Sequence, residues 1–270
     1  MKLSKPTTRK ATTALILTAT LVSVGLAADS SKPAKSLDGL PLVFEDDFET
    51  GKAKNWEPAS PDGWKVTHQG DNHVYSQHTS IQIKTPHRSP YNRAFIKDLY
   101  VGDFVLDVQL QSTKKDYPHR DMCLFFGYQD PAHMYYVHLG KRMDPHANNI
   151  FIVNGADRKS ISTKTTEGTN WDDEWHHARV VRNVETGTID IYFDDMETPV
   201  MTAVDKHFTW GQVGIGSFDD TGNFDDVLLY GDKVEKPKEE SCRRGAVAIP
   251  QTPARPGRRC PTDSAQQRLW

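Results

Sequence analysis

The middle of the chain alternates apolar and polar side chains with a period of two. In DFVLDVQLQS, which begins at Asp103, every second residue from Phe104 to Leu110 is apolar, and Asp107 falls on the polar side. Successive side chains of a β-strand point to opposite faces, so this period indicates strands with one buried and one solvent-facing side. TIDIYFDD, which begins at Thr188, repeats the pattern.

Further runs of the same kind predict an all-β protein. They are DMCLFFGY, HMYYVHLGK, NNIFIVNG, HARVVR and GQVGIGSF, and turn signals with Pro or Gly separate them. About ten or more short strands within roughly 190 residues favour a two-sheet antiparallel sandwich of the jelly-roll kind. In such a sandwich the apolar faces meet and the polar faces look outward. An outer face rich in polar and aromatic side chains would suit a hydroxyl-rich ligand.

The N-terminus has a different pattern. Basic residues within positions 2–10 precede an apolar stretch at 11–26, and small residues end it at Ala27. This order is typical of a secretory signal peptide over residues 1–27. The apolar stretch is shorter than a membrane span and contains Thr and Ser. We therefore expect a secreted, periplasmic or cell-envelope protein with no membrane span after signal removal.

The remaining boundaries follow from composition. Residues 28–39 are polar and are predicted to be a linker, and the jelly-roll domain is predicted at 40–232. Residues 233–270 combine many Pro, Arg and Lys with little periodicity, which predicts a disordered tail. The predicted domain has 30 Asp and Glu against 18 Lys and Arg, although the whole chain carries a formal charge of only −3. An acidic domain repels phosphate backbones, so no nucleic-acid partner is expected.

The three cysteines do not form a disulfide framework. Cys123 lies inside an apolar run and is predicted to be a buried free thiol. Cys242 and Cys260 lie in the predicted tail and could pair with each other, and their spacing fits no zinc motif.

Three stretches of the chain resemble concanavalin A-like jelly rolls. They are FEDDF at 44–48, WHHARVVR followed by ETGTIDIYFDD at 175–195, and GIGSF followed by FDDV at 214–227. They are similar to laminin-G-like domains and to bacterial 3-keto-disaccharide hydrolase-like domains. The resemblance implies a two-sheet antiparallel sandwich, in a superfamily of lectins, glycoside hydrolases, polysaccharide lyases and adhesion modules. The chain lacks the E-x-D-x-E carboxylate pair of glucanases, which counts against a laminarinase-type hydrolase.

Reactive side chains are concentrated around HMYYVHLGK. Tyr136 and His138 share one face of this strand, opposite its apolar residues, so we expect both to project from the outer face of the sheet. With Arg120 and Asn149 they would supply what β-elimination of an acidic polysaccharide requires: a group that neutralises the carboxylate, a base and an acid. These four residues are the candidate catalytic residues.

The same residue types would also bind a glycan without chemistry. Tyr136 would then stack on a sugar ring while polar neighbours hydrogen-bond the hydroxyl groups. The candidate substrate-binding residues are His119, Asp121, His146, Asp107 and Arg158. A structural role is the third possibility, in which Arg120 and Asp121 form an ion pair that closes a loop.

A calcium ion is the one metal that the sequence predicts. Asp47 lies near the first strand and Asp226 near the last, and the two would be neighbours if the terminal strands pair. Carboxylates with backbone carbonyls suit Ca²⁺, and jelly rolls similar to this one often carry such a structural ion. His176 and His177 are adjacent on a strand and point to opposite faces, so they cannot hold one ion together.

Zinc is not expected at the histidines near residue 70, because His68, His73 and His78 show no metal-ligand spacing.

Together these features predict a secreted protein that binds or processes an oligosaccharide or polysaccharide on the outer face of one sheet. This would be 3-keto-disaccharide hydrolase-like or lectin-like. Two alternatives stay open: a polysaccharide lyase that uses the Arg, His, Tyr and Asn set, and a non-catalytic envelope adhesion module. The acidic domain disfavours a uronate polymer unless Arg120, Arg142 and Arg158 form a local basic patch.

Overall fold

A computed structural model describes residues 32–237 of the chain. The predicted signal peptide at 1–27, most of the predicted tail at 233–270, and both Cys242 and Cys260 lie outside the described residues. Within them, no helix is long and apolar enough to cross a membrane.

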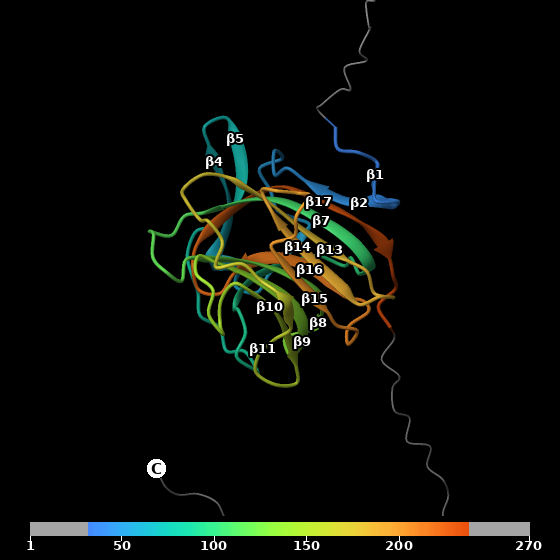
Figure 1. Cartoon of the computed structure of the whole chain (residues 1–270). Coiled ribbons are helices and arrows are strands. Elements are labelled where there is room, and N and C mark those ends of the chain that lie inside the picture. Colours follow the sequence, from blue (N-terminus) through green and yellow to red (C-terminus); the bar gives the residue numbers. More distant parts are fainter. Residues whose placement is uncertain (1–31, 238–270) are drawn as a thin grey trace, which may run out of the picture. The chain divides into compact units, whose positions relative to one another are not determined.

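The described residues form two antiparallel β-sheets (Figure 1). The larger sheet has ten strands. They are β1 (Ser36–Leu37), β2 (Leu40–Asp46), β4 (Trp64–Gln69), β5 (Asn72–Gln77), β7 (Val101–Ser112), β12 (Ser162–Lys164), β13 (His176–Arg182), β14 (Thr188–Phe193), β15 (Met201–Val204) and β17 (Gly222–Lys233). Their order is β1-β2-β17-β7-β13-β14-β15-β12, and the hairpin β4–β5 joins the sheet through β17.

The smaller sheet has seven strands and packs against the larger one. These strands are β3 (Trp56–Pro58), β6 (Asn92–Ile96), β8 (Asp121–Asp130), β9 (His133–Gly140), β10 (Asn149–Asn154), β11 (Lys159–Ser160) and β16 (Gln212–Ser217). Their order is β11-β10-β9-β8-β16-β6-β3. A single 3₁₀ turn, η1 (Pro61–Gly63), precedes β4. The predicted class, an all-β antiparallel two-sheet sandwich, is confirmed.

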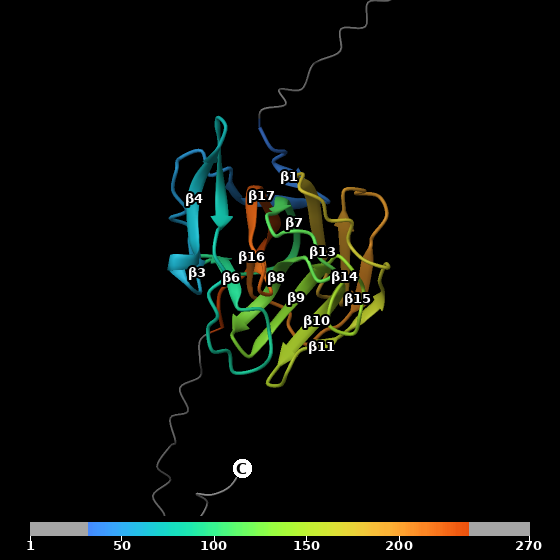
Figure 2. The same ribbon diagram turned by 90° about the vertical axis from the view of Figure 1, so that its left-hand side faces the viewer.

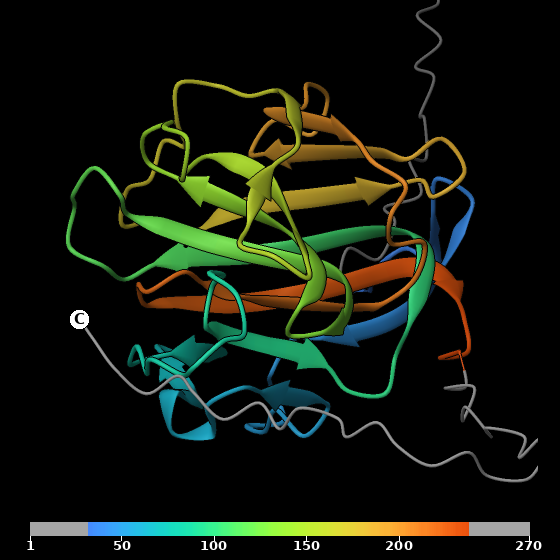
Figure 3. The ribbon, with the colours of Figure 1, turned by 90° about the horizontal axis from the view of Figure 1, so that it is seen from below.

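The core lies between the two sheets and follows the predicted alternation. On β7, which runs beside β17 in Figure 3, Leu106 and its apolar neighbours at every second position belong to the core, whereas Asp107 faces away. On β14 the same holds for Ile189 and Ile191. Burial of these side chains is the main favourable contribution to the free energy of folding.

The outer face of the smaller sheet is apolar, contrary to the expectation of a polar face. Its cluster consists of Phe95, Cys123, Phe125, Met134, Tyr136, Phe151 and Val153. The loop at 78–91, in blue-green, crosses this side of the sheet (Figure 2). It is tied to the β10–β11 turn because the Arg88 N–H donates to Asp157 at 2.8 Å and the Arg158 N–H donates to the Arg88 carbonyl at 3.1 Å. A loop therefore buries strand faces that solvent would otherwise reach.

The sandwich extends a few residues beyond the predicted limits of 40 and 232. β1, inside the predicted linker, pairs with β2 through a tight turn at Asp38 and Gly39, whose φ angles are 51° and 82°. An Asp-Gly pair favours such two-residue hairpins because both positions need positive φ. At the other end β17 runs to Lys233, and the Val234 N–H donates to the Tyr100 carbonyl at 2.9 Å.

Candidate functional site

A groove of about 360 Å³ opens on the outer face of the smaller sheet, where β8 begins and β9 ends. We call it the His138 groove. Five residues predicted from the sequence line it: His119, Asp121, His138, His146 and Arg158. Six further lining residues were not among the candidate site residues: Arg88, Tyr117, Asp144, Ala147, Phe218 and Asp219.

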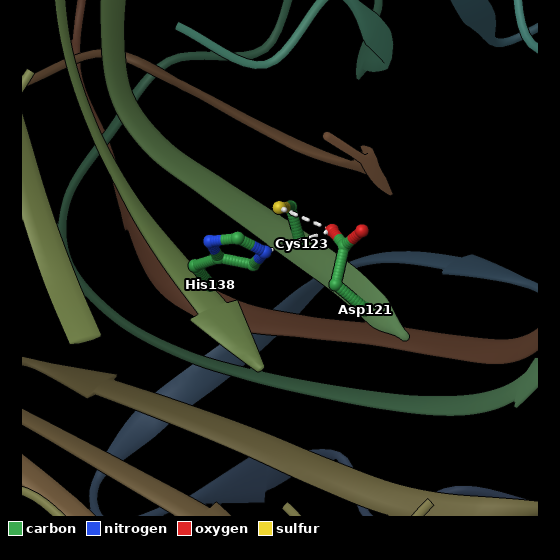
Figure 4. Close-up of side chains that lie close together, drawn as sticks. All are labelled: Asp121, Cys123 and His138. Atoms are coloured by element: carbon green, nitrogen blue, oxygen red, sulfur yellow. Dashed lines mark hydrogen bonds and ion pairs between the residues drawn. The ribbon is translucent and has the colours of Figure 1, made fainter. Parts of the chain in front are cut away.

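Asp121 and His138 form the floor of the groove (Figure 4). Asp121 lies at the start of β8, and His138 on β9 stands directly opposite Cys123. The Asp121 Oδ2 atom lies 3.2 Å from His138 Nε2, accepts the Phe218 N–H at 2.8 Å and accepts the Cys123 thiol at 3.5 Å. Both floor residues are nearly inaccessible to solvent.

The protonation of the His138 ring follows from its neighbours. Nδ1 lies 2.9 Å from the His146 carbonyl oxygen, and a carbonyl can only accept a hydrogen bond. Nδ1 therefore carries the proton, and Nε2 faces the carboxylate of Asp121. Because both ring nitrogens are directed at protein atoms and Nε2 is buried, His138 offers neither nitrogen to a sugar hydroxyl in the groove.

One wall of the groove is aromatic and cationic. The Phe218 ring is partly exposed, and the guanidinium groups of Arg158 and Arg88 lie 4.3 and 5.8 Å from its centroid. The His138 ring stacks on the same phenyl ring, with 5.9 Å between centroids. This arrangement fixes an apolar surface beside two hydrogen-bond donors.

Next to this wall the groove is acidic. Carboxylate oxygens of Asp121, Asp219 and Asp220 lie within 4.8 Å of one another. Burial and the negative charge of Asp121 raise the pKa of both Asp219 and Asp220. Asp220 is fully buried and accepts the Tyr117 hydroxyl at 2.7 Å and the Asp121 N–H at 2.9 Å, so it anchors the rim to the floor.

Tyr136 lies on the same face of β9 as His138, as predicted, but it does not reach the groove. Its side chain is fully buried and stacks on Phe151, with 5.1 Å between ring centroids. Its hydroxyl accepts a hydrogen bond from Arg158 at 3.2 Å. The expectation that Tyr136 stacks on a sugar is wrong because Phe125, Phe151 and Arg158 surround its side chain and leave no ring face exposed.

Arg120 is also held within the protein. Its side chain is 1% exposed and donates to the Ser112 hydroxyl at 2.9 Å, to the Ser112 carbonyl at 2.8 Å and to Asp173 at 2.9 Å. No ion pair joins it to Asp121 among the described residues. Because neighbouring strand residues point to opposite faces, Arg120 cannot share the groove with Asp121.

Asn149 pairs with His138 across β9 and β10, yet its amide is occupied by the adjoining turn. Its Nδ2 donates to the Asp144 and Ala147 carbonyls at 3.0 and 2.9 Å, and its Oδ1 accepts the Ser160 hydroxyl at 3.1 Å. The four candidate catalytic residues are thus not assembled in one accessible place. Only His138 reaches the groove.

Asp107 lies on the other sheet and is not part of the groove. It accepts two hydrogen bonds from Arg179, at 2.6 and 2.8 Å, and lies 3.1 Å from His177 Nε2. Burial would raise the pKa of Asp107, but the bonds from His177 and Arg179 outweigh it and lower that pKa. The opposite directions predicted for His176 and His177 are confirmed, because His176 turns inward against Phe193.

Asp47 and Asp226 come together as predicted. β17 pairs first with β5 and then with β2, and Asp226, at a φ of 45°, occupies the irregularity between the two pairings. Both residues line a pocket of about 450 Å³ whose other charged residues are Glu45, Asp46, Lys32, Lys52 and Lys54. Burial and the charges of Asp47 and Glu49 raise the pKa of Asp226. Calcium binding at this pocket stays a prediction, and the ammonium groups of the three lysines compete with an ion for the carboxylates.

A third depression, of about 250 Å³, lies on the larger sheet. Asn72, Gln109, Trp175, Asp225 and Asp226 line it. Amides beside an indole ring also suit sugars, so this depression is the alternative location for a ligand. The sequence analysis singled out none of its residues as substrate-binding. Cys123, in contrast, is the buried free thiol that was predicted.

The sequence matches no protein-family model and no curated protein sequence. Solved structures that are similar to this chain include a carbohydrate-binding module from Bacillus subtilis. The two chains are 17% identical, the alignment covers 66% of this chain and 96% of the other, and the TM-score is 0.46. Peanut lectin, solved with a 9-residue peptide, has 13% identity, 72% and 98% coverage, and a TM-score of 0.48. Domain 4 of an extracellular arabinanase from Geobacillus stearothermophilus has 9% identity, 72% and 94% coverage, and a TM-score of 0.45. At these values no activity or residue role is transferred to this chain.

The burial of Tyr136 predicts a structural role. Tyr136→Ala should lower the free energy of unfolding by about 3–5 kcal/mol, because it opens a cavity against Phe151. Tyr136→Phe should cost only about 1 kcal/mol, the scale of its lost hydrogen bond. Tyr192→Ala, at a partly exposed position of β14, is the control. It should lower the free energy of unfolding by less than about 1 kcal/mol, as substitutions at the surface do. Urea unfolding measures all three, and equal losses for Tyr136→Ala and Tyr192→Ala would contradict the burial.

Thermal unfolding with and without Ca²⁺ tests the calcium prediction. A bound ion stabilises only the folded state, by about 2.7 kcal/mol at one hundred times its Kd, so Ca²⁺ should raise the Tm. Asp226→Asn should abolish this rise, since Asn tolerates the positive φ but lacks the charge. Asp98→Asn, at an exposed position with a φ of 53°, should keep it. A Tm that is the same in Ca²⁺ and in chelator removes the ion from this site.

Proposed function

We propose that the chain binds a glycan in the His138 groove. The observation that carries this proposal is the combination of Phe218, two guanidinium groups, two exposed imidazoles and the carboxylates of Asp144 and Asp219 around one opening. Sugars present C–H faces that pack on aromatic rings, and hydroxyl groups that both donate and accept hydrogen bonds. A single opening here offers partners for both kinds of surface.

The size and charge of the groove narrow the ligand. A volume of about 360 Å³ is at the lower end of the range of ligand pockets, roughly 300–1,000 Å³, which favours the end of a glycan chain. The carboxylates of Asp121, Asp219 and Asp220 would repel a uronate at their end of the groove. A neutral glycan, with its hydroxyl groups shared between Arg158 and Asp219, fits this division of charge.

The arrangement supports binding better than elimination. The lyase hypothesis needs Arg120, Tyr136 and Asn149 at the substrate, and all three side chains are buried and engaged elsewhere. Together with the signal peptide predicted at 1–27, the groove supports an exported glycan-binding protein.

Hydrolysis is a second candidate because of one residue. Asp219 lines the groove, and burial and the charge of Asp121 raise its pKa, which is the direction that a general acid on a leaving sugar oxygen requires. A second carboxylate is also needed, and Asp144 is another carboxylate that lines the groove.

Titration calorimetry with glycans chosen from an array tests the binding proposal. His119→Ala and Asp219→Asn each remove one polar partner from an exposed wall, so each should weaken the affinity by about fivefold to tenfold, which corresponds to roughly 1 kcal/mol. His133→Ala is the matched control, because this exposed histidine pairs with Asp130 at the opposite end of β9.

Product analysis of the same mixtures separates binding from hydrolysis. A pure binder leaves the glycan intact with wild-type protein and with all three variants. Cleavage that Asp219→Asn abolishes would favour the hydrolase. If no variant in the groove changes the affinity for any glycan that the wild type binds, the proposal fails.

A further inference from the structure

Beneath the groove, three side chains of different chemistry point to one position. Asp121 and Cys123 come from the same face of β8, and His138 comes from the neighbouring strand β9 (Figure 4). A carboxylate oxygen, the sulfur and a ring nitrogen of these residues all lie within 4.8 Å of one another. Asp121 and His138 also line the groove, so this buried position lies directly beneath it.

The His138 ring is oriented as a metal-binding imidazole is. Its Nδ1–H donates to the His146 carbonyl, which leaves the lone pair of Nε2 directed at the cluster. Nε2 is buried and makes no aligned hydrogen bond, although Asp121 Oδ2 lies 3.2 Å away. A lone pair that faces a carboxylate oxygen at this distance is repulsive unless a proton or a cation lies between them.

The spacing of the donor atoms matches a tetrahedral ion. Zinc bonds of about 2.0 Å to nitrogen and oxygen and about 2.3 Å to sulfur place N and O about 3.3 Å apart, and S and O about 3.5 Å apart. The structure has His138 Nε2 at 3.2 Å and Cys123 Sγ at 3.5 Å from Asp121 Oδ2. The third pair, His138 Nε2 and Cys123 Sγ, lies within 4.8 Å, so a shift of about 1.3 Å or less brings it to the spacing of a tetrahedral ion.

We propose that Asp121, Cys123 and His138 bind a zinc ion at the floor of the His138 groove. Imidazole, thiolate and carboxylate together favour zinc over calcium or magnesium, which prefer oxygen ligands alone. The carboxylates of Asp219 and Asp220, close to that of Asp121, add negative charge around the ion. Because Asp121 and His138 also line the groove, a water molecule from the groove would complete the tetrahedron.

Binding exchanges two protons for the metal. The S–H bond of Cys123 breaks, and the sulfur forms a bond to Zn²⁺. The proton that lies between His138 Nε2 and Asp121 Oδ2 in the metal-free chain also leaves, so that Nε2 binds through its lone pair and Asp121 through a carboxylate oxygen; both protons pass to water in the groove. No electron transfer takes place.

The test uses the full chain, freed of metal with a chelator and titrated with zinc alone. We expect one equivalent of zinc per chain by elemental analysis, and a rise in Tm when zinc is added. Cobalt(II) in place of zinc should give a thiolate charge-transfer band in the near ultraviolet. Because no glycan is present, these results do not depend on the proposed function.

Variants assign the ligands. Cys123→Ser and His138→Gln each remove one ligand at nearly constant volume and should weaken zinc binding by more than about 100-fold, beyond the effect of a lost supporting hydrogen bond. The double variant Cys242→Ser/Cys260→Ser and the single variant His133→Ala are controls, which should keep the wild-type affinity and the cobalt band. Tm values in chelator identify any variant that fails to fold.

Three outcomes would overturn the site. The first is a wild-type chain that binds less than a tenth of an equivalent of zinc when zinc is in excess. The second is a cobalt–thiolate band that persists in Cys123→Ser, and the third is one that disappears in the Cys242→Ser/Cys260→Ser control. If Cys123→Ser does not fold, the zinc affinity of His138→Gln decides in its place.

Discussion

Burial of β8, β9 and β10 on both faces is the constraint on which the rest of the structure depends. Their inner faces pack against the larger sheet, Tyr128 and Phe218 pack against the cluster on the outer faces, and the loop at 78–91 crosses that side. The cover ends where β9 ends. Tyr136 therefore lies inside an apolar cluster, whereas His138, two residues farther along, reaches a groove.

Three carboxylates at or just beyond the ends of strands surround the acidic part of this groove. Asp121 begins β8, and Asp219 and Asp220 follow β16 after Phe218. Asp220 holds the Tyr117 hydroxyl and the Asp121 N–H, and Asp121 in turn accepts the Phe218 N–H. These carboxylates accept the hydrogen bonds that hold the loop ends in place, and they also make this part of the groove acidic. The groups that stabilise the fold therefore disfavour a negatively charged ligand here.

The strands and their facing could be predicted from the sequence because both depend on local periodicity. DFVLDVQLQS became β7 with Leu106 inward, and HMYYVHLGK became β9 with Tyr136 and His138 on one side. The cover could not be predicted, since it depends on where a loop without periodicity packs. A usable signal existed: Phe125, Met134 and Phe151 stand at positions where a solvent-facing strand would carry polar residues. Asp107 was wrongly predicted to bind the substrate for a similar reason. Alternation predicts which face of a strand a residue lies on, but not which sheet the strand joins.

The central claim is that the His138 groove, and not the depression beside Trp175 on the other sheet, is where a ligand binds. Amide and side-chain NMR shifts of the isotope-labelled chain, recorded while a bound glycan is titrated, test it most directly. The account predicts saturable shifts concentrated at His119, His146, Phe218 and Asp219, with Asn72 and Trp175 unchanged. Shifts confined to Asn72, Gln109 and Trp175 would contradict it.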